Sequence, residues 1–170
     1  MRNDLIRTDY ESMIIRVIQE SAEVIHAITK FQQYGPIAID DKTGIIYNNS
    51  TQLLSELDDV EHAMLVLLKY LTIHTNTSNI EAPSYPTVQS ANGQITLYLH
   101  SILVAATNTI WTCINTQALI ELVNTNYNTS VLIQLRNSML DFINKIQYTR
   151  LYFKENQDLS YQERTNINAN

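Results

Sequence analysis

The sequence predicts an all-α protein, an antiparallel bundle of four or five helices. Turn-forming residues are scarce, with three glycines and three prolines among 170 residues, and a many-stranded sheet needs more of them. Apolar residues recur at intervals of three and four over long stretches, which is the spacing of one face of a helix. The length suits one domain, which we expect over residues 1–155 with a frayed tail at 156–170.

The first long helix is expected over residues 8–34. Its apolar stripe consists of Tyr10, Ile14, Val17, Val24, Ile28 and Phe31. Gly35 and Pro36 end it, because proline cannot continue a helix and the residue before proline avoids helical geometry. Residues 37–49 hold two β-branched runs on either side of DKTG at 41–44, which indicates a loop or a small hairpin.

A second long helix is expected from a cap at Asn49 or Ser50 to about residue 74. Its stripe consists of Leu53, Leu57, Val60, Met64, Leu68 and Leu71. The connection between the two helices favours an antiparallel hairpin over residues 8–74. The polar residues 75–93 hold two of the three prolines and should form a long connection. Further helices are expected between residues 95 and 153, with a break near residues 125–129.

Composition narrows the class of protein. Net charge is −6, from 17 acidic and 11 scattered basic residues, which argues against long nucleic acid as a partner. The single cysteine, Cys113, excludes an intramolecular disulfide and a cysteine-rich zinc site. The first residues carry charges where a signal peptide would be apolar, and we expect no membrane span of about 20 residues. The sequence therefore predicts a soluble cytoplasmic protein with no membrane partner.

Four acidic residues form two pairs with matching positions on the first two helices. Glu20 and Glu23 are three residues apart on the first, and Glu56 and Asp59 are three apart on the second, so each pair shares one helix face. At about 100° per residue, both pairs lie on the same side of their apolar stripes. An antiparallel helix pair brings such sides together, and the sequence therefore predicts that the four carboxylates converge.

Carboxylates this close need a cation. Each close pair costs about 3 to 4 kcal/mol at an effective dielectric near 20. Oxygen ligands without cysteine favour Mg²⁺, with Mn²⁺ as the second choice. A metal held in this way could bind a nucleotide polyphosphate and polarise a water for attack at phosphorus. The alternative is that these acids are a solvated helix face.

The segments QESAEVIHAI at 19–28 and SELDDVEHAMLVL at 55–67 resemble the paired ExxE and ExxD motifs of the MazG-like, all-α nucleoside triphosphate pyrophosphohydrolases. The resemblance covers about residues 8–72. It implies that Glu20, Glu23, Glu56 and Asp59 are Mg²⁺ ligands and catalytic residues, with one carboxylate orienting or deprotonating the attacking water. It also implies release of a monophosphate and pyrophosphate, and assembly as a homodimer or homotetramer. Gln19 stands where the family often has a glutamate.

Other side chains are candidates for contacts with a nucleotide. Lys30 and Lys145 are the candidates for phosphate binding, because phosphate chains need cations in addition to a metal. For Lys30 and Lys69, a surface lysine whose stem packs on apolar neighbours is the commoner case. The remaining candidates are Lys69, Arg136 and Arg150 for phosphate, His26 and His62 for phosphate or proton transfer, and Tyr98, Trp111 and Tyr148 for base stacking or the core.

The function favoured by the sequence is Mg²⁺-dependent hydrolysis of a nucleoside triphosphate or related nucleotide between the α and β phosphates. Two alternatives stay open. A nucleotide-binding or sequestering protein with little turnover is suggested by Gln19 and by a second half that does not align with the family. A helical interaction protein without a metal site predicts that Mg²⁺ has no effect on thermal stability.

Overall fold

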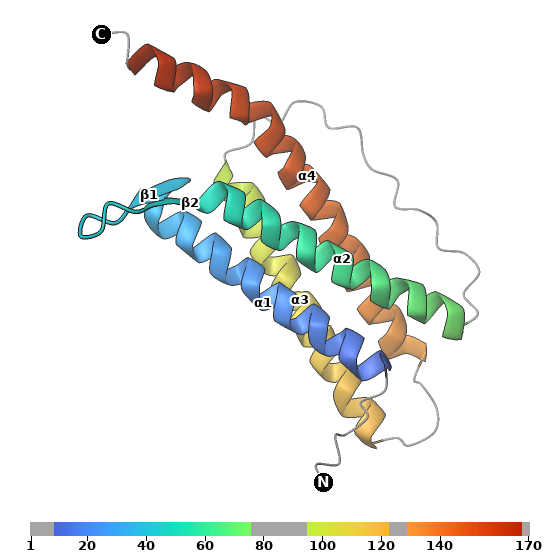
Figure 1. Ribbon diagram of the computed structural model, residues 1–170. Helices are drawn as coiled ribbons and strands as arrows, with labels where there is room; N and C mark the ends of the chain where they lie inside the picture. Colours follow the sequence, from blue (N-terminus) through green and yellow to red (C-terminus); the bar gives the residue numbers. More distant parts are fainter. Residues whose placement is uncertain (1–8, 76–94, 123–128, 168–170) are drawn as a thin grey trace.

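Four long helices and one small hairpin make up the described chain (Figure 1). The computed structural model describes the backbone of residues 9–75, 95–122 and 129–167, and side chains over 10–71, 95–118 and 130–154. The elements are α1 (Asp9–Tyr34), β1 (Ile37–Ile39), β2 (Ile46–Asn48), α2 (Asn49–Thr75), α3 (Ile95–Leu122) and α4 (Thr129–Ile167). The predicted all-α class is confirmed.

Helices α1 and α2 run antiparallel along most of their length, as Figure 1 shows. Their apolar stripes meet in the core, where every predicted stripe residue is buried except Phe31, which is partly buried. α3 packs against α1 and α4, and α4 also packs against α2. Each helix therefore borders two others, and the predicted helix hairpin forms one side of a four-helix bundle.

A two-stranded antiparallel hairpin joins α1 to α2 and projects from the end of the bundle (Figure 1). Ile37 pairs with Asn48 and Ile39 with Ile46. At the turn, the Asp40 carboxylate accepts a hydrogen bond from the Lys42 amide at 2.9 Å. The sequence left a loop and a hairpin open for residues 37–49, and the hairpin is what forms.

The base of this hairpin fixes where α1 ends and α2 begins. Gly35 has a φ of 77°, a left-handed conformation that ends a helix at little cost in glycine. Its carbonyl accepts a hydrogen bond from the Asn49 side chain at 2.8 Å. The helix cap is Asn48, whose side-chain oxygen accepts from the Thr51 amide at 3.0 Å. The cap predicted at Asn49 or Ser50 is therefore one or two residues too late, because the Asn49 side-chain amide donates to Gly35 instead.

The C-terminal half forms α3 and α4 where further helices were predicted. α4 continues to Ile167, through most of the tail expected to be frayed at 156–170, since no glycine or proline follows Gly93 to interrupt it. The long connection predicted at 75–93 and the break near 125–129 fall almost entirely outside the described residues. By length and composition α3 could cross a membrane over Ile95–Ala118, and a third of that window is buried in the bundle.

Candidate metal centre

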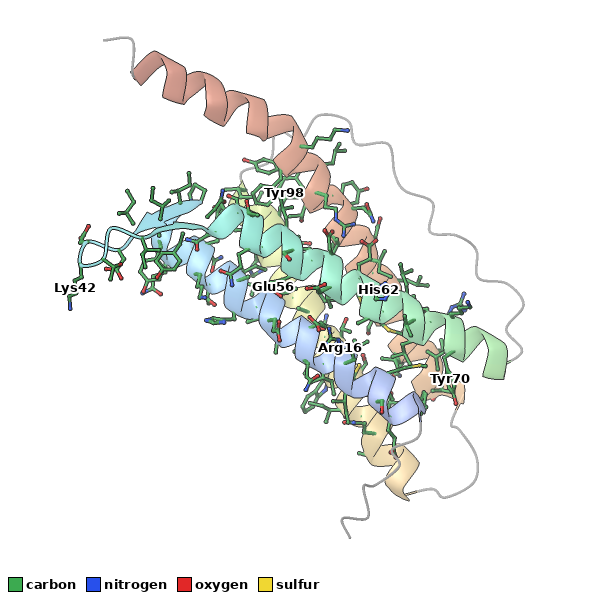
Figure 2. The ribbon with its side chains drawn as sticks, viewed as in Figure 1. Arg16, Lys42, Glu56, His62, Tyr70 and Tyr98 are labelled. Carbon is green, nitrogen blue, oxygen red and sulfur yellow. The ribbon has the colours of Figure 1, made fainter. Side chains whose placement is uncertain are left out.

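Three of the four predicted carboxylates come together between α1 and α2. Glu20 of α1 and Glu56 and Asp59 of α2 each offer an oxygen, and these oxygens lie within 4.8 Å of one another. Figure 2 places Glu56 about halfway along the helix pair. The antiparallel packing produces this approach, because the two acidic pairs lie on the flanks that α1 and α2 turn toward each other.

The three carboxylates differ in solvent exposure, which increases from Glu20 to Glu56 to Asp59. Glu20 is 3% exposed, Glu56 is partly buried and Asp59 is exposed. A ligand can therefore reach the cluster from the Asp59 side, while Glu20 forms its inner wall. Three oxygen donors of this kind, partly open to water, suit a hard divalent cation that keeps some of its own water ligands.

Glu23 lies at the rim of the cluster rather than inside it. Its side chain is exposed, one helical turn from Glu20. It still acts on the other carboxylates: after burial, the negative charge of Glu23 and its hydrogen bond with Glu56 are the next causes that raise the pKa of Glu56. The structure thus places the fourth predicted acid beside Glu56, outside the group of three whose oxygens lie within 4.8 Å.

The pKa of Glu20 is raised as well, and the causes identify its surroundings. Burial is the largest, and it is partly opposed by the positive charge of Arg16. The charges of Glu23 and Asp59 raise the pKa further. Both Glu20 and Glu56 therefore hold a proton more tightly than a free carboxyl does, because each is removed from water and lies beside other carboxylates, which raises the pKa.

Arg16 is a residue of this centre that the sequence reasoning missed. Its guanidinium lies 2.6 Å from the Glu20 carboxylate, four residues further along α1, and its side chain is 62% exposed. The spacing of four was readable in the sequence as an ion pair on one helix face. Arg16 offsets part of the charge of the cluster and occupies one oxygen that a metal would use.

Helix α2 carries a second acidic pair that serves as an internal comparison. Asp58 and Glu61 are also three residues apart, but they lie on the flank that faces α4. Arg150 contacts both, with its guanidinium 2.5 Å from Asp58, and Gln147 donates a hydrogen bond to Glu61 at 2.5 Å. Arg150 compensates part of the charge of this pair, whereas Glu56 and Asp59 face other carboxylates.

The predicted phosphate-binding lysines differ in their surroundings. Lys145 forms an ion pair with Asp141 of its own helix at 2.8 Å. Lys30 is partly buried on α1, and a rise of about 1.5 Å per residue puts it about 10 Å along the helix from Glu23. Arg150, considered for the same role, is held by Asp58 and Glu61.

The other candidates are dispersed over the bundle. His26 and His62 are exposed on α1 and α2, and Tyr148 is partly buried on α4. The ring of Tyr98 lies 5.1 Å from that of Tyr152, between centroids. Trp111 is exposed on α3, a helix that borders α1 and α4. The structure therefore puts Trp111 away from the face where the carboxylates meet.

No protein-family model, curated protein or solved structure matches this chain. The assignment of a function consequently depends on the carboxylates themselves and on the motifs in which they lie.

Proposed function

We propose that the protein is a Mg²⁺-dependent nucleotide pyrophosphohydrolase of the MazG-like type, which cleaves a nucleoside triphosphate or related nucleotide to a monophosphate and pyrophosphate. The observation that carries the proposal is the approach of Glu20, Glu56 and Asp59 to within 4.8 Å from two antiparallel helices. The resemblance of residues 19–28 and 55–67 to the paired acidic motifs of that family adds the class of reaction.

The donor set fits Mg²⁺, with Mn²⁺ as an alternative ion. All the donors are carboxylate oxygens, which both ions prefer, and the pKa values of Glu20 and Glu56 are raised first by burial and then by the negative charge of neighbouring carboxylates. Glu20, Glu56 and Asp59 would hold the metal, and Glu23 at the rim would complete the set. When bound, such an ion neutralises phosphate charge and lowers the pKa of a coordinated water.

We assign the other roles in the reaction to individual side chains of the cluster. Asp59 and Glu23 are exposed and face incoming substrate, so either can orient a water or accept its proton. Glu20 and Glu56 hold the inner side of the site. Arg16 is exposed and already directed at the cluster, so its guanidinium can turn to a phosphate when a metal takes the Glu20 oxygen.

The experiment is incubation of the purified protein with a panel of nucleoside triphosphates, with and without Mg²⁺, followed by chromatography of the products. We expect monophosphate and pyrophosphate only when metal is present. Glu56→Gln and Asp59→Asn should lower turnover by about 100-fold or more, since even outer-shell changes at metal sites cost about 10- to 100-fold. Asp58→Asn and Glu61→Gln are the matched controls on the same helix and should stay active.

Unchanged turnover in both Glu56→Gln and Asp59→Asn would refute the assignment of the site.

A second candidate function is sequestration of a nucleotide without turnover, and Gln19 favours it because that position lies next to Glu20 and cannot accept a proton from water. Intact nucleotide that stays bound through desalting in the presence of Mg²⁺ would support this second function over hydrolysis.

A further inference from the structure

Helices α1 and α2 carry the same short sequence pattern around their acids. ESAEVIHAI at 20–28 matches ELDDVEHAM at 56–64, with glutamate, a second acid, valine, histidine, alanine and a final apolar residue at the same spacings. An offset of 36 residues relates Glu20 to Glu56, and the same offset relates Glu23 to Asp59. The two helices are therefore two copies of one motif.

The two copies are also buried in the same way. Val24 and Val60 are both fully buried, and Ala27 and Ala63 are 2 and 6% exposed. The histidine before each alanine is exposed in both copies. Corresponding residues thus occupy corresponding places on the two helices, so the match is one of structure as well as of sequence.

An approximate two-fold axis relates the two copies, because the helices run antiparallel. A rotation about this axis exchanges the first acids of the two copies, and likewise the second acids. Each first acid should then lie beside the second acid of the other helix. Glu20 and Asp59 do offer oxygens within 4.8 Å of each other, and Glu56 and Glu23 share a hydrogen bond. The carboxylate centre therefore lies on the axis.

A symmetric set of donors cannot by itself distinguish the two ends of a ligand. A nucleoside triphosphate is unsymmetrical, because one end carries the charged terminal phosphates and the other end is an uncharged nucleoside. Its two ends can be distinguished only by residues at which the two copies of the motif differ. The direction in which such a ligand lies therefore depends on the few unmatched positions beside the acids.

Arg16 and Gln52 are unmatched positions of this kind. Arg16 stands four residues before Glu20, and Gln52 stands four residues before Glu56. Both side chains are exposed. Because the helices are antiparallel, Arg16 and Gln52 lie at opposite ends of the carboxylate centre, and Figure 2 shows Arg16 on the Tyr70 side of Glu56. The centre thus has a cation at one end and a neutral amide at the other.

We propose that Arg16 gives this centre its direction: it binds the terminal phosphates of a polyphosphate, and the nucleoside end lies toward Gln52 and the base of the hairpin. The inference rests on the proposed function for the class of ligand. A guanidinium can donate two parallel hydrogen bonds to a phosphate. The guanidinium of Arg16 already lies 2.6 Å from the Glu20 carboxylate, next to the oxygens that would hold the metal.

The other basic residues of the two helices do not supply a direction near the acids. His26 and His62 occupy matched positions, so each end has one. Lys30 and Lys69 lie about 10 and 15 Å along their helices beyond the second acids, and the antiparallel packing puts one at each end. Arg16 is therefore the group that makes the two ends of the centre different.

The test is titration calorimetry with inorganic triphosphate in the presence of Mg²⁺, a probe that has no base to recognise. Arg16→Gln should weaken its binding about 10-fold, the order expected for a lost hydrogen bond to a charged group. Arg16→Gln/Gln52→Arg should restore most of the lost affinity, because the axis makes position 52 equivalent to position 16. Affinity for Mg²⁺ alone should not fall in Arg16→Gln, so the loss belongs to the phosphates.

The matched control is Arg16→Gln/Thr51→Arg. It adds the same charge one residue away on α2, but about 100° around the helix from position 52, and Thr51 is exposed. This variant should bind triphosphate as weakly as Arg16→Gln does. Equal rescue from positions 51 and 52 would overturn the two-fold relation, and so would no rescue from position 52. Unchanged binding in Arg16→Gln would overturn the role of Arg16.

The direction itself is tested by Gln52→Arg in the wild-type background, with ATP, GTP, CTP and UTP as additional probes. A cation at both ends should strengthen the binding of inorganic triphosphate but of none of the nucleotides, whose second end is uncharged. A nucleotide that gained as much as triphosphate would overturn the assigned direction. These are binding measurements, so Arg16-dependent binding without hydrolysis would refute the proposed reaction and keep this inference, whereas hydrolysis with unchanged triphosphate binding in Arg16→Gln would do the reverse.

Discussion

Glu20 is a carboxylate that sits almost completely inside a helix pair and still faces other carboxylates. Burying an acid is costly unless it is paired, and Arg16 pairs only one of its oxygens while Asp59 and Glu56 approach from the neighbouring helix. The folded protein therefore carries an electrostatic cost at this point. Binding of a divalent cation would stabilise the folded state at such a site, because the cation would compensate the negative charge of the carboxylates.

The repulsion should be visible as pH-dependent stability. Burial and the charges of Glu23, Asp59 and Glu20 raise the pKa of Glu56 above its usual 4.5, so the folded protein binds this proton more tightly than the unfolded chain. Stability contributed by Glu56 is then full below pH 4.5 and is lost as pH rises through the raised pKa. At neutral pH and without metal, Glu56→Gln should raise Tm by about 2 to 4 °C, the effect of about 1 kcal/mol in a domain of this size.

The measurement is thermal unfolding in chelator, at neutral pH and below about pH 4, where the carboxyl is protonated in both states and the two proteins should unfold alike. Asp58→Asn is the control. The Asp58 carboxylate accepts a hydrogen bond from Arg150, so its replacement by an amide should not raise the Tm. A Glu56→Gln protein no more stable than wild type at neutral pH would show that the cluster is solvated rather than strained.

Arg16 competes with a metal for Glu20. Replacing Arg16 by Gln removes the guanidinium that lies 2.6 Å from the carboxylate, so the oxygen becomes free for Mg²⁺. Since exposed ion pairs contribute less than about 1 kcal/mol, we expect Mg²⁺ to bind about 2- to 5-fold more tightly. The check is titration calorimetry without nucleotide. Weaker Mg²⁺ binding in this variant would mean that Arg16 organises the site instead of competing for it.

At the scale of elements, α2 carries acids on both flanks, and the two flanks contact different groups. The Asp58 and Glu61 flank attaches α4 through Arg150 and Gln147. Glu61 is only 15% exposed and Arg150 only 26%, so removal of the guanidinium leaves a largely buried carboxylate with less compensation. This contact therefore fixes how α4 lies on α2.

We expect Arg150→Met to lower the free energy of unfolding by about 1 to 3 kcal/mol, the usual cost of leaving a buried polar group unsatisfied. Lys145→Met is the matched control on the same helix. The Lys145 ion pair with Asp141 is an exposed pair four residues apart, which contributes about 0.5 kcal/mol or less. Urea unfolding of both variants measures the difference, and equal losses would contradict a special role for Arg150.

Helices and the acidic flanks could be predicted from the sequence because both follow from the 3.6-residue period. Leu53, Leu57 and Val60 mark the buried stripe of α2, and their positions determine that Glu56 and Asp59 face α1. The period does not determine which ion pairs form between helices. Arg150 reaches Asp58 only because α4 packs on α2 at a particular height.

The ends of the helices could be predicted only where glycine or proline marks them. Gly35 and Pro36 end α1, and their effect is local. Asn48, Asn49 and Ser50 are all acceptable caps, so the choice of Asn48 depends on the tertiary hydrogen bond from Asn49 to Gly35. Past Gly93 no breaker remains, and composition alone did not indicate that α4 extends to Ile167.

At the scale of the whole molecule, the bundle presents two faces of opposite chemical character. The α1 and α2 pair exposes the acidic side chains of Glu23 and Asp59, and α3 exposes the apolar side chains of Leu97, Val104 and Trp111. Because α3 borders α1 and α4, the two faces belong to different sides of the bundle.

The hairpin between α1 and α2 sets the alignment of the carboxylates from a distance. Its paired base and the Asn49 hydrogen bond to Gly35 fix α2 lengthwise and rotationally against α1. A residue inserted in the turn between Thr43 and Gly44 lengthens only a loop that projects into solvent. A residue inserted after Asn49 rotates the following helix by about 100° and turns Glu56 and Asp59 away from Glu20. The chain can therefore vary in length at the tip of the hairpin but not at its foot.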